Sequence, residues 1–225
     1  MKLYLIRHAE SENNAAPTYR RVEDPSLTAI GRLQAEYLAK WLRTLRADVF
    51  ITSPFRRTLE TATAILQEVP WQLRIWHNVF ERGGCFRGFD ESSWEGATGL
   101  GKSGIERLLG DFRQRCRIDD TISEQGWWHQ RNKESDPEAV ERASQVCSRL
   151  EEEFSETETV VLLIHADLKR LMMDRMLGGE VDVSKLGNLR NVGITRFNRT
   201  HDGWQLDYFN SVSHLPSKLI TGNEH

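Results

Sequence analysis

Two arginines and two histidines stand where α/β proteins place the polar groups of a ligand site. Arg7 and His8 directly follow the first apolar run of the chain, LYLI, and His165 directly follows the apolar run VVLLI. Arg57 lies in the first turn of the helix expected after a third run, DVFIT. Ligands of α/β sheets bind outside the carboxyl ends of the strands, so we expect these four side chains to meet at one edge of a sheet.

Four such groups gathered at one edge favour a phosphate ligand. A histidine after a strand is more often structural than catalytic, and a single arginine usually pairs with a surface carboxylate. Two guanidinium groups together, however, match phosphate oxygens through paired hydrogen bonds, and a helix N-terminus adds partial positive charge. Glu81 is the first carboxylate after a further expected strand, WQLRIW, so it can lie near the same edge.

The hydrophobic pattern predicts strands that alternate with amphipathic helices. Strands are expected at residues 3–6, 48–52, 71–76 and 160–164, and a hairpin at residues 193–197 and 204–209. Helices are expected to begin at Thr28, at Ser53-Pro54 and at Asp136-Pro137, and a fourth covers residues 166–177. The alternation indicates a layered α/β domain with a mainly parallel sheet.

Helical spacing also predicts which side chains of these helices face the core. In the helix after Thr28 they are Ile30, Leu33, Tyr37, Leu38, Trp41, Leu42 and Leu45. In the helix after Pro137 they are Val140, Ala143, Val146, Leu150 and Phe154. A shorter helix is expected to begin at Ser103, because Glu106 follows it in capping-box spacing.

Residues 82–135 interrupt the alternation and are rich in glycine, arginine and tryptophan. We interpret them as an insertion that covers one end of the sheet. Arg82 and Arg87 lie in a glycine-rich stretch, and we expect them to reach over the site and bind a second anionic group, unless they are simply solvated. One run of bulky side chains either lines a substrate pocket or packs the insertion onto the core: Trp127, Trp128 and His129.

Composition limits the classes of partner and compartment. The chain has 225 residues, 39% of them hydrophobic, and a formal net charge of -3, which argues against a broad surface for nucleic acid or an anionic membrane. The three cysteines form no CxxC pair, and the other histidines show no metal-ligand spacing. No apolar run is long enough for a signal-peptide core or a membrane span, so we expect a cytoplasmic protein.

Six motifs in order resemble the histidine phosphatase superfamily, also called the phosphoglycerate mutase-like superfamily. They are LIRHAESENN, SLTAIGRLQA, SPFRRTLETA, FERGG, LLIHADLKRLM and NVGIT, and together they span nearly the whole chain. The resemblance implies a single domain, residues 1–225, folded as a three-layer αβα sandwich with residues 82–135 as a cap. It also implies a phosphatase that needs no metal or cofactor, acts on a small phosphorylated molecule and is a monomer or homodimer.

The resemblance assigns roles residue by residue. It implies that His8 is the nucleophile that becomes phosphorylated and that Glu81 is the proton donor. Three side chains would hold the phosphate: Arg7, Arg57 and His165. Further candidates for binding the substrate are Ser11, Asn14 and Ala166, and both Ala9 and Ala166 replace glycines common in the family.

Three other functions remain open at this point. A cofactor-dependent phosphoglycerate mutase would use the same groups, but its acid is typically followed by His-Tyr-Gly, whereas Arg82-Gly83-Gly84 follows Glu81 here. A catalytically silent phosphate-binding protein would have kept the pocket, although all five expected catalytic side chains are present. A metallohydrolase would gather a different set, which Arg7 would oppose by repelling the cation: His8, Glu10, His165 and Asp167.

Overall fold

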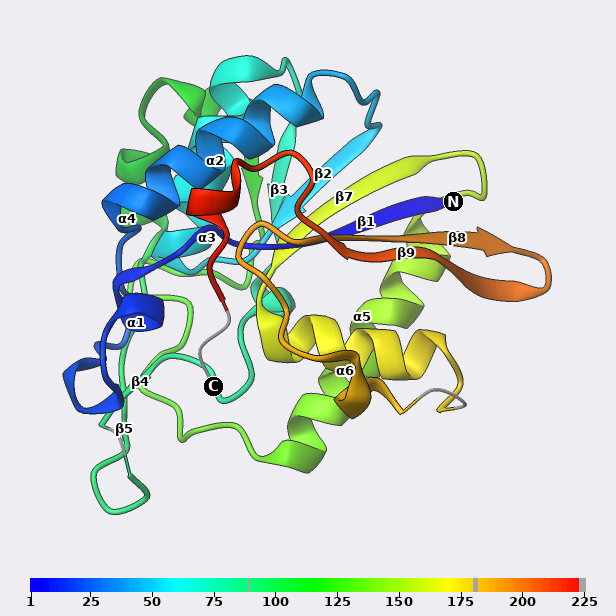
Figure 1. Ribbon diagram of the computed structural model, residues 1–225. Helices are drawn as coiled ribbons and strands as arrows, with labels where there is room; N and C mark the ends of the chain where they lie inside the picture. The colour runs from blue at the N-terminus through cyan, green and yellow to red at the C-terminus, as the bar shows by residue number, and fades with distance from the viewer. Residues whose placement is uncertain (89, 180–181, 223–225) are drawn as a thin grey trace.

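One seven-stranded sheet forms the centre of the computed structural model, which describes residues 1–88, 90–179 and 182–222. In spatial order the strands are β6 (Cys116–Ile118), β3 (Leu73–Ile75), β2 (Val49–Thr52), β7 (Thr159–Ile164), β1 (Lys2–Arg7), β8 (Ile194–Thr200) and β9 (Gly203–Ser211). The first five are parallel, and β8 and β9 add an antiparallel hairpin beside β1. The prediction of a mainly parallel sheet is confirmed (Figure 1).

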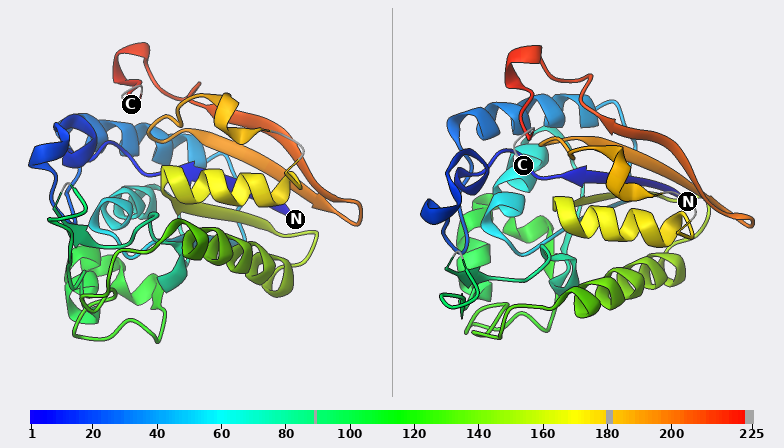
Figure 2. Two further views of the ribbon diagram at one scale, coloured as in Figure 1. Left: turned by 90° about the horizontal axis from the view of Figure 1, so that it is seen from below. Right: turned by 60° about the horizontal axis from the view of Figure 1, so that its bottom comes forward.

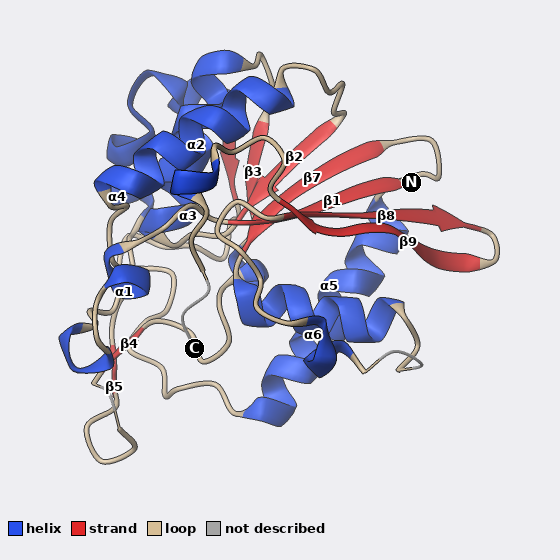
Figure 3. Cartoon of the chain, viewed as in Figure 1, coloured by secondary structure: helices blue, strands red, loops and turns tan. Residues whose placement is uncertain are grey.

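Helices cover both faces of the sheet, which confirms the three-layer αβα fold (Figure 3). They are α2 (Ala29–Leu42), α3 (Arg56–Glu68) and α4 (Lys102–Leu109) on one side and α5 (Asp136–Glu153) and α6 (Ala166–Met176) on the other. The short helix α1 (Glu12–Ala15) buries no residue and belongs to neither layer. Tyr4 and Ile6 of β1 join the core with α2 and α3, whereas Leu3 and Leu5 join the core with α5 and α6. Because strands such as β1 and β7 are buried on both faces, their sequences are apolar almost throughout.

Short elements complete the fold. They are η1 (Thr18–Arg20), η2 (His77–Val79), η3 (Gly110–Arg115), η4 (Val183–Leu186), η5 (Ser217–Leu219) and the two-stranded ribbon of β4 (Phe86–Arg87) and β5 (Glu95–Gly96). The C-terminal segment lies alongside α2, where Gln34 Nε2 donates to the Leu219 carbonyl at 2.8 Å (Figure 2). Within the described residues, no helix combines the length and the apolar character needed to cross a membrane.

The inward face of α2 differs from the prediction. Thr28 caps the helix as expected, but three side chains predicted in the core are exposed: Ile30, Leu33 and Tyr37. Gly31 and Gln34 face inward instead, because α2 packs closely on the chain after β1. A Cβ at Gly31 would lie 2.0 Å from the Glu10 carbonyl oxygen, and the Gln34 side-chain oxygen accepts from Glu10 N at 2.8 Å. The close contact of α2 with the backbone of Glu10, rather than the widest apolar stripe of the helix, therefore determines which side of α2 faces the core.

Two helix starts predicted from serine and proline positions were wrong by one or two residues. Helix α3 begins at Arg56 rather than Pro54, since the carboxylate of Asp24 accepts from Arg56 N at 2.8 Å and supplies the N-terminal acceptor from far away in the sequence. Helix α4 begins at Lys102, and the Ser103 hydroxyl donates to Glu124 at 2.5 Å rather than forming a capping box. The predicted strand at residues 71–76 shortens to β3.

Helix α5 also differs from the prediction at its start and on its inward face. Ser135, not Asp136, is the N-cap, and its backbone N and hydroxyl both donate to Glu138. Val140 is 56% exposed, while Arg142 is buried on the face that carries Ala143 and the other predicted core residues of this helix. A polar side chain therefore occupies a core position of α5.

The segment 82–135 is tied to the main fold at several points. Its strand β6 pairs with β3 at the edge of the central sheet, and α4 contacts α3. Trp127 and Trp128 are fully buried, with ring centroids 5.6 Å and 5.0 Å from that of Phe80. Of the two roles open for these tryptophans, the structure supports packing onto the core. His129 is exposed.

Candidate active site

The four predicted polar groups lie together at the carboxyl ends of the parallel strands. His8 follows β1, His165 is the N-cap residue of α6 after β7, and Arg57 lies in the first turn of α3 after β2. The ring centroids of His8 and His165 are 5.1 Å apart, and Arg57 Nε lies 3.1 Å from His8 Nε2. A cavity of about 820 Å³ opens here, and its lining includes Arg7, His8, Asn14, Arg57, Glu81 and Ala166.

The hydrogen bonds of His8 determine which ring nitrogen carries the proton and which bears the lone pair. His8 Nδ1 lies 2.7 Å from the Ala9 carbonyl oxygen, which can only accept, so Nδ1 carries the proton. His8 Nε2 accepts from Arg57 Nε and therefore bears the lone pair. Burial, together with the charges of Arg57 and Arg7, lowers the pKa of His8 well below its usual value. The imidazole is neutral at physiological pH, with a nucleophilic Nε2.

Arg7 brings a buried donor that lacks a protein partner. Its Nη1 donates to the Leu189 carbonyl at 2.5 Å, whereas its Nε has no acceptor among the described residues. Burial lowers the pKa of Arg7 to about 10, so the guanidinium stays charged at neutral pH. An unpaired buried donor is unfavourable by about 1–3 kcal/mol, which an anionic ligand in the cavity would relieve.

His165 presents a second unpaired donor. Its Nε2 lies 2.8 Å from the Ser53 hydroxyl, while its Nδ1 has no partner in the part of the chain that the structure describes. The amide of Phe55 donates to Ser53 Oγ at 3.4 Å, and the hydroxyl keeps its own proton as a donor. In the tautomer in which Ser53 donates to His165 Nε2, the ring proton lies on Nδ1. Burial, followed by the charge of Arg57, lowers the pKa of His165, so it is a neutral donor.

Aromatic packing fixes the arginine of α3. The Arg57 guanidinium lies 4.0 Å from the ring centroid of Phe55, a cation–π contact. The same ring packs edge-on against His165 at 5.0 Å and against Trp127 at 4.7 Å. Trp127 therefore supports the site from behind, without lining the cavity.

Glu81 reaches the cavity from the loop after η2. Its Oε1 accepts from Arg82 N at 2.9 Å and from Leu168 N, at the start of α6, at 3.3 Å. Burial and the neighbouring Asp167 carboxylate raise the pKa of Glu81 to about 7, against the opposite effect of Arg57. A carboxyl group with this pKa is protonated for part of the time at neutral pH, as a general acid must be.

A family model for the histidine phosphatase superfamily (branch 1) matches residues 3–212. The chain belongs to this superfamily. Phosphoserine phosphatase 1 of Hydrogenobacter thermophilus is 29% identical over 191 residues, which cover 82% of this chain and 79% of that protein. A 2,3-bisphosphoglycerate-dependent phosphoglycerate mutase of Methylorubrum extorquens is 36% identical over 69 residues, 30% of this chain and 32% of that protein.

Solved structures agree with this assignment of the fold. A phosphoserine phosphatase mutant from Entamoeba histolytica, crystallised with phosphoserine, superposes with a TM-score of 0.64 at 25% identity and covers 96% of this chain and 99% of that chain. The α-ribazole phosphatase from Shigella flexneri has a TM-score of 0.65 at 21% identity, covering 94% and 96%. The second likeness concerns the fold alone.

Of the predicted site residues of this histidine phosphatase, His165 is fully buried behind the cavity lining, whereas Ser11, Asn14 and Ala166 border the cavity. Asn14 lies in α1, and its side-chain oxygen accepts from both the backbone N and the hydroxyl of Ser11, at 3.1 Å and 2.9 Å. The Ser11 hydroxyl is thus already used within the protein. Ala166 borders the cavity at the N-terminus of α6, where backbone N–H groups favour an anion.

Several residues that support the site were missed by sequence reasoning. Ser53 was interpreted as a helix cap, although it orients His165. Asn191 is fully buried and donates to the His8 carbonyl at 3.2 Å, which fixes the backbone beside the reactive ring. Both lie in motifs, SPFRRTLETA and NVGIT, that marked the resemblance, but a motif does not reveal which side chain its residues contact.

The set required by a metallohydrolase is not assembled. Glu10 Oε1 accepts from the Thr28 hydroxyl at 2.6 Å, on the side of the loop that packs against α2. Among the described residues, no three side chains of His, Cys, Asp or Glu lie close enough together to hold a metal ion. Cys85 is buried, and burial raises the pKa of its thiol to about 12, so this thiol is not a reactive group.

Proposed function

We propose that this chain is a phosphatase that hydrolyses phosphate monoesters through a phosphohistidine on His8. The observation that carries the proposal is the pairing of a neutral His8 Nε2 with three surrounding donors. Arg57 Nε already faces this nitrogen, and Arg7 Nε and His165 Nδ1 are buried without partners. A phosphoryl group would satisfy the two unpaired donors beside the nucleophile.

The proposed reaction has two steps. Arg57 Nε first moves its hydrogen bond from His8 Nε2 to a phosphoryl oxygen, which frees the Nε2 lone pair. His8 Nε2 then attacks phosphorus, the phosphorus–oxygen bond to the leaving group breaks, and the departing alkoxide takes the proton of Glu81. Water then attacks phosphohistidine and gives a proton to the Glu81 carboxylate, which releases phosphate and restores His8. The guanidinium groups of Arg7 and Arg57 stabilise the charge on the transferred phosphoryl oxygens.

We expect turnover to proceed in excess EDTA and to pass through an acid-labile phosphoenzyme. The measurement is rapid quenching with ³²P-labelled phosphomonoester in alkali, followed by denaturing electrophoresis with and without acid treatment. A label that survives acid, or activity lost in EDTA and restored by a divalent ion, contradicts the mechanism. A panel of phosphosugars, phosphoglycerates, nucleotides and phosphopeptides, compared by kcat/KM, then identifies the substrate class.

A phosphoglycerate mutase is the second candidate, favoured by the 69-residue similarity to the Methylorubrum extorquens enzyme. Such an enzyme must return the phosphoryl group to its intermediate and exclude water. Incubation with 3-phosphoglycerate, with and without 2,3-bisphosphoglycerate, separates the two by ³¹P NMR. We expect inorganic phosphate to form, whereas accumulation of 2-phosphoglycerate would indicate a mutase. As part of the proposal, the substrate is a small molecule and the enzyme acts in the cytoplasm as a monomer or homodimer.

The segment 82–135 is proposed as the cap that selects the substrate. Arg82 borders the cavity and pairs with Asp136 at 3.1 Å. Arg87 is not among the residues that border the cavity. It pairs with Glu95 at 3.4 Å, on the exposed ribbon of β4 and β5. Lys133 borders the cavity, with its ammonium 3.1 Å from the ring centroid of Trp94. Within the segment 82–135, the cations that border the cavity are therefore Arg82 and Lys133.

We expect Arg82→Ala and Lys133→Ala to raise KM up to about fivefold for substrates with a second negative group, since partly exposed ion pairs contribute about 0.2–1 kcal/mol. The KM of a neutral-tailed ester should not change. Arg87→Ala is the matched control and should behave as wild type on both substrates. Equal effects on the two substrates would show that these cations do not read substrate charge.

A further inference from the structure

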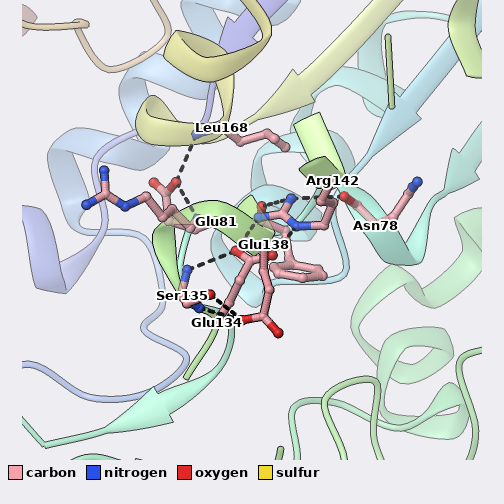
Figure 4. Close-up of polar contacts among 10 residues, drawn as sticks. Asn78, Glu81, Glu134, Ser135, Glu138, Arg142 and Leu168 are labelled. Carbon is pink, nitrogen blue, oxygen red and sulfur yellow. Dashed lines mark hydrogen bonds and ion pairs between the residues drawn. The ribbon is translucent and has the colours of Figure 1, made fainter. Parts of the chain in front are cut away.

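A buried ion pair lies directly behind the loop that carries Glu81. Arg142 Nε is 2.6 Å from Glu134 Oε1 and Arg142 Nη2 is 2.7 Å from Glu134 Oε2, a two-pronged contact. The two side chains are only 8% and 6% exposed. Glu134 lies just before α5 and Arg142 on its inward face (Figure 4).

Arg142 holds the chain on the N-terminal side of Glu81. Its Nη1 donates to the carbonyl oxygens of Asn78 and Phe80, both at 3.0 Å. Its guanidinium carbon also lies 3.7 Å from the ring centroid of Phe80. Arg142 thus fixes the carbonyl groups of Asn78 and Phe80, in the stretch of chain immediately before Glu81.

Glu134 holds the chain on the C-terminal side of Glu81. Its Oε2 accepts from Gly83 N at 3.2 Å, and its own backbone N donates to the Gly83 carbonyl at 3.1 Å. Gly83 has a φ of +92°, a conformation that side chains other than glycine rarely adopt. The turn after Glu81 is therefore pinned to Glu134 by both its N–H and its C=O.

Stability alone is a weak reason for such a pair. Desolvation of two buried charges offsets much of their attraction, and a well-packed apolar pair is often equally stable. An apolar pair, however, could not bind the backbone of Asn78, Phe80 and Gly83. What the ion pair adds is a fixed path for the loop, and general acid catalysis depends on such placement because a displacement of about 1 Å can reduce the rate about 10²-fold.

We propose that Glu134 and Arg142 are positioning residues that hold the Glu81 carboxyl group at the phosphate site. The proposal rests on the proposed role of Glu81 as proton donor. Glu134 belongs to the segment 82–135, so this segment serves the phosphoryl-transfer step as well as substrate choice.

The first test uses Glu134→Gln and Arg142→Lys, which keep the size or the charge but lose the two-pronged contact. We expect kcat on an alkyl phosphate to fall about 10- to 100-fold, with a much smaller loss on p-nitrophenyl phosphate, whose leaving group needs little protonation. Matched controls are Glu153→Gln and Arg149→Lys, a more exposed pair on the same helix with a 2.6 Å contact. Equal losses on the two substrates would overturn the proposal.

The second test places Arg142→Lys in a Glu81→Gln background and includes thermal melts of every variant. If Arg142 acts through Glu81, its selective effect on the alkyl phosphate disappears once the acid is gone, so the two effects are not additive. Additive effects would indicate a merely structural role. If the single variant Glu81→Gln slows both substrates equally, the proposed role of Glu81 as proton donor fails. If Glu81→Gln is selective for the alkyl phosphate but the single variant Arg142→Lys is not, the positioning proposal fails.

Discussion

His8→Ala should remove turnover while the protein remains folded. The other neutral imidazole of the cluster, His165, has its Nε2 engaged by the Ser53 hydroxyl at 2.8 Å. It cannot replace His8, and loss of a covalent nucleophile typically reduces kcat by about 10⁴- to 10⁶-fold. His8 is 2% exposed, so its removal leaves a small void and should lower the free energy of unfolding by about 1–3 kcal/mol without preventing folding. Hydrolysis and phosphoenzyme labelling are measured together with a thermal melt.

The matched control for this variant is His201→Ala. The His201 side chain is 85% exposed in the turn between β8 and β9, far along the chain from the site. It should be active and labelled like the wild type. Hydrolysis at the wild-type rate by His8→Ala, with the fold intact, would rule out a phosphohistidine at this position.

Glu81→Gln should slow alkyl phosphates by about 10²- to 10⁴-fold and p-nitrophenyl phosphate far less, because the amide cannot protonate a poor leaving group. The wild type should also lose kcat on alkyl phosphates as the pH rises through about 7. The sign follows from the raised pKa: below about pH 7 Glu81 carries the proton that it must donate, and above it the proton is lost. In Glu81→Gln this decline should be absent.

Full pH profiles of kcat for both substrates, in wild type and Glu81→Gln, give the measurement. Glu152→Gln, an exposed carboxylate of α5, is the control and should keep the wild-type profile. If Glu81→Gln loses equal activity on alkyl and p-nitrophenyl esters, Glu81 orients the substrate and another group supplies the proton.

The residues that sequence could place are those fixed by the sheet. Arg7 ends β1, and His8 and His165 come directly after β1 and β7, so parallel pairing of these strands brings the three residues together without detailed knowledge of the packing. Arg57 follows in the same way from the helix after β2. The mainly parallel sheet, the hairpin of β8 and β9, and most core positions of α3 were predictable from the period of apolar residues alone.

What sequence could not place depends on contacts between distant segments. Ser53-Pro54 has the composition of a helix start, but Asp24 supplies the acceptor for α3 and leaves Ser53 to His165. Arg142, and not Val140, lies on the inward face of α5. There its guanidinium donates to the carbonyl groups before Glu81 and to the carboxylate of Glu134. The sequence shows that the charged Arg142 lies within the apolar stripe of this helix, but it does not show which groups Arg142 contacts.

The ribbon of β4 and β5 pairs only within itself and shares no ladder with the central sheet. Phe86 of β4 and Trp94, which precedes β5, nevertheless border the cavity. His8, Arg57 and His165 stand at the ends of central strands or on the helices that follow them, and Glu81 stands on the loop after η2. Under the proposed function, we therefore expect substitutions in the ribbon to alter which leaving group fits while the geometry of phosphoryl transfer stays unchanged.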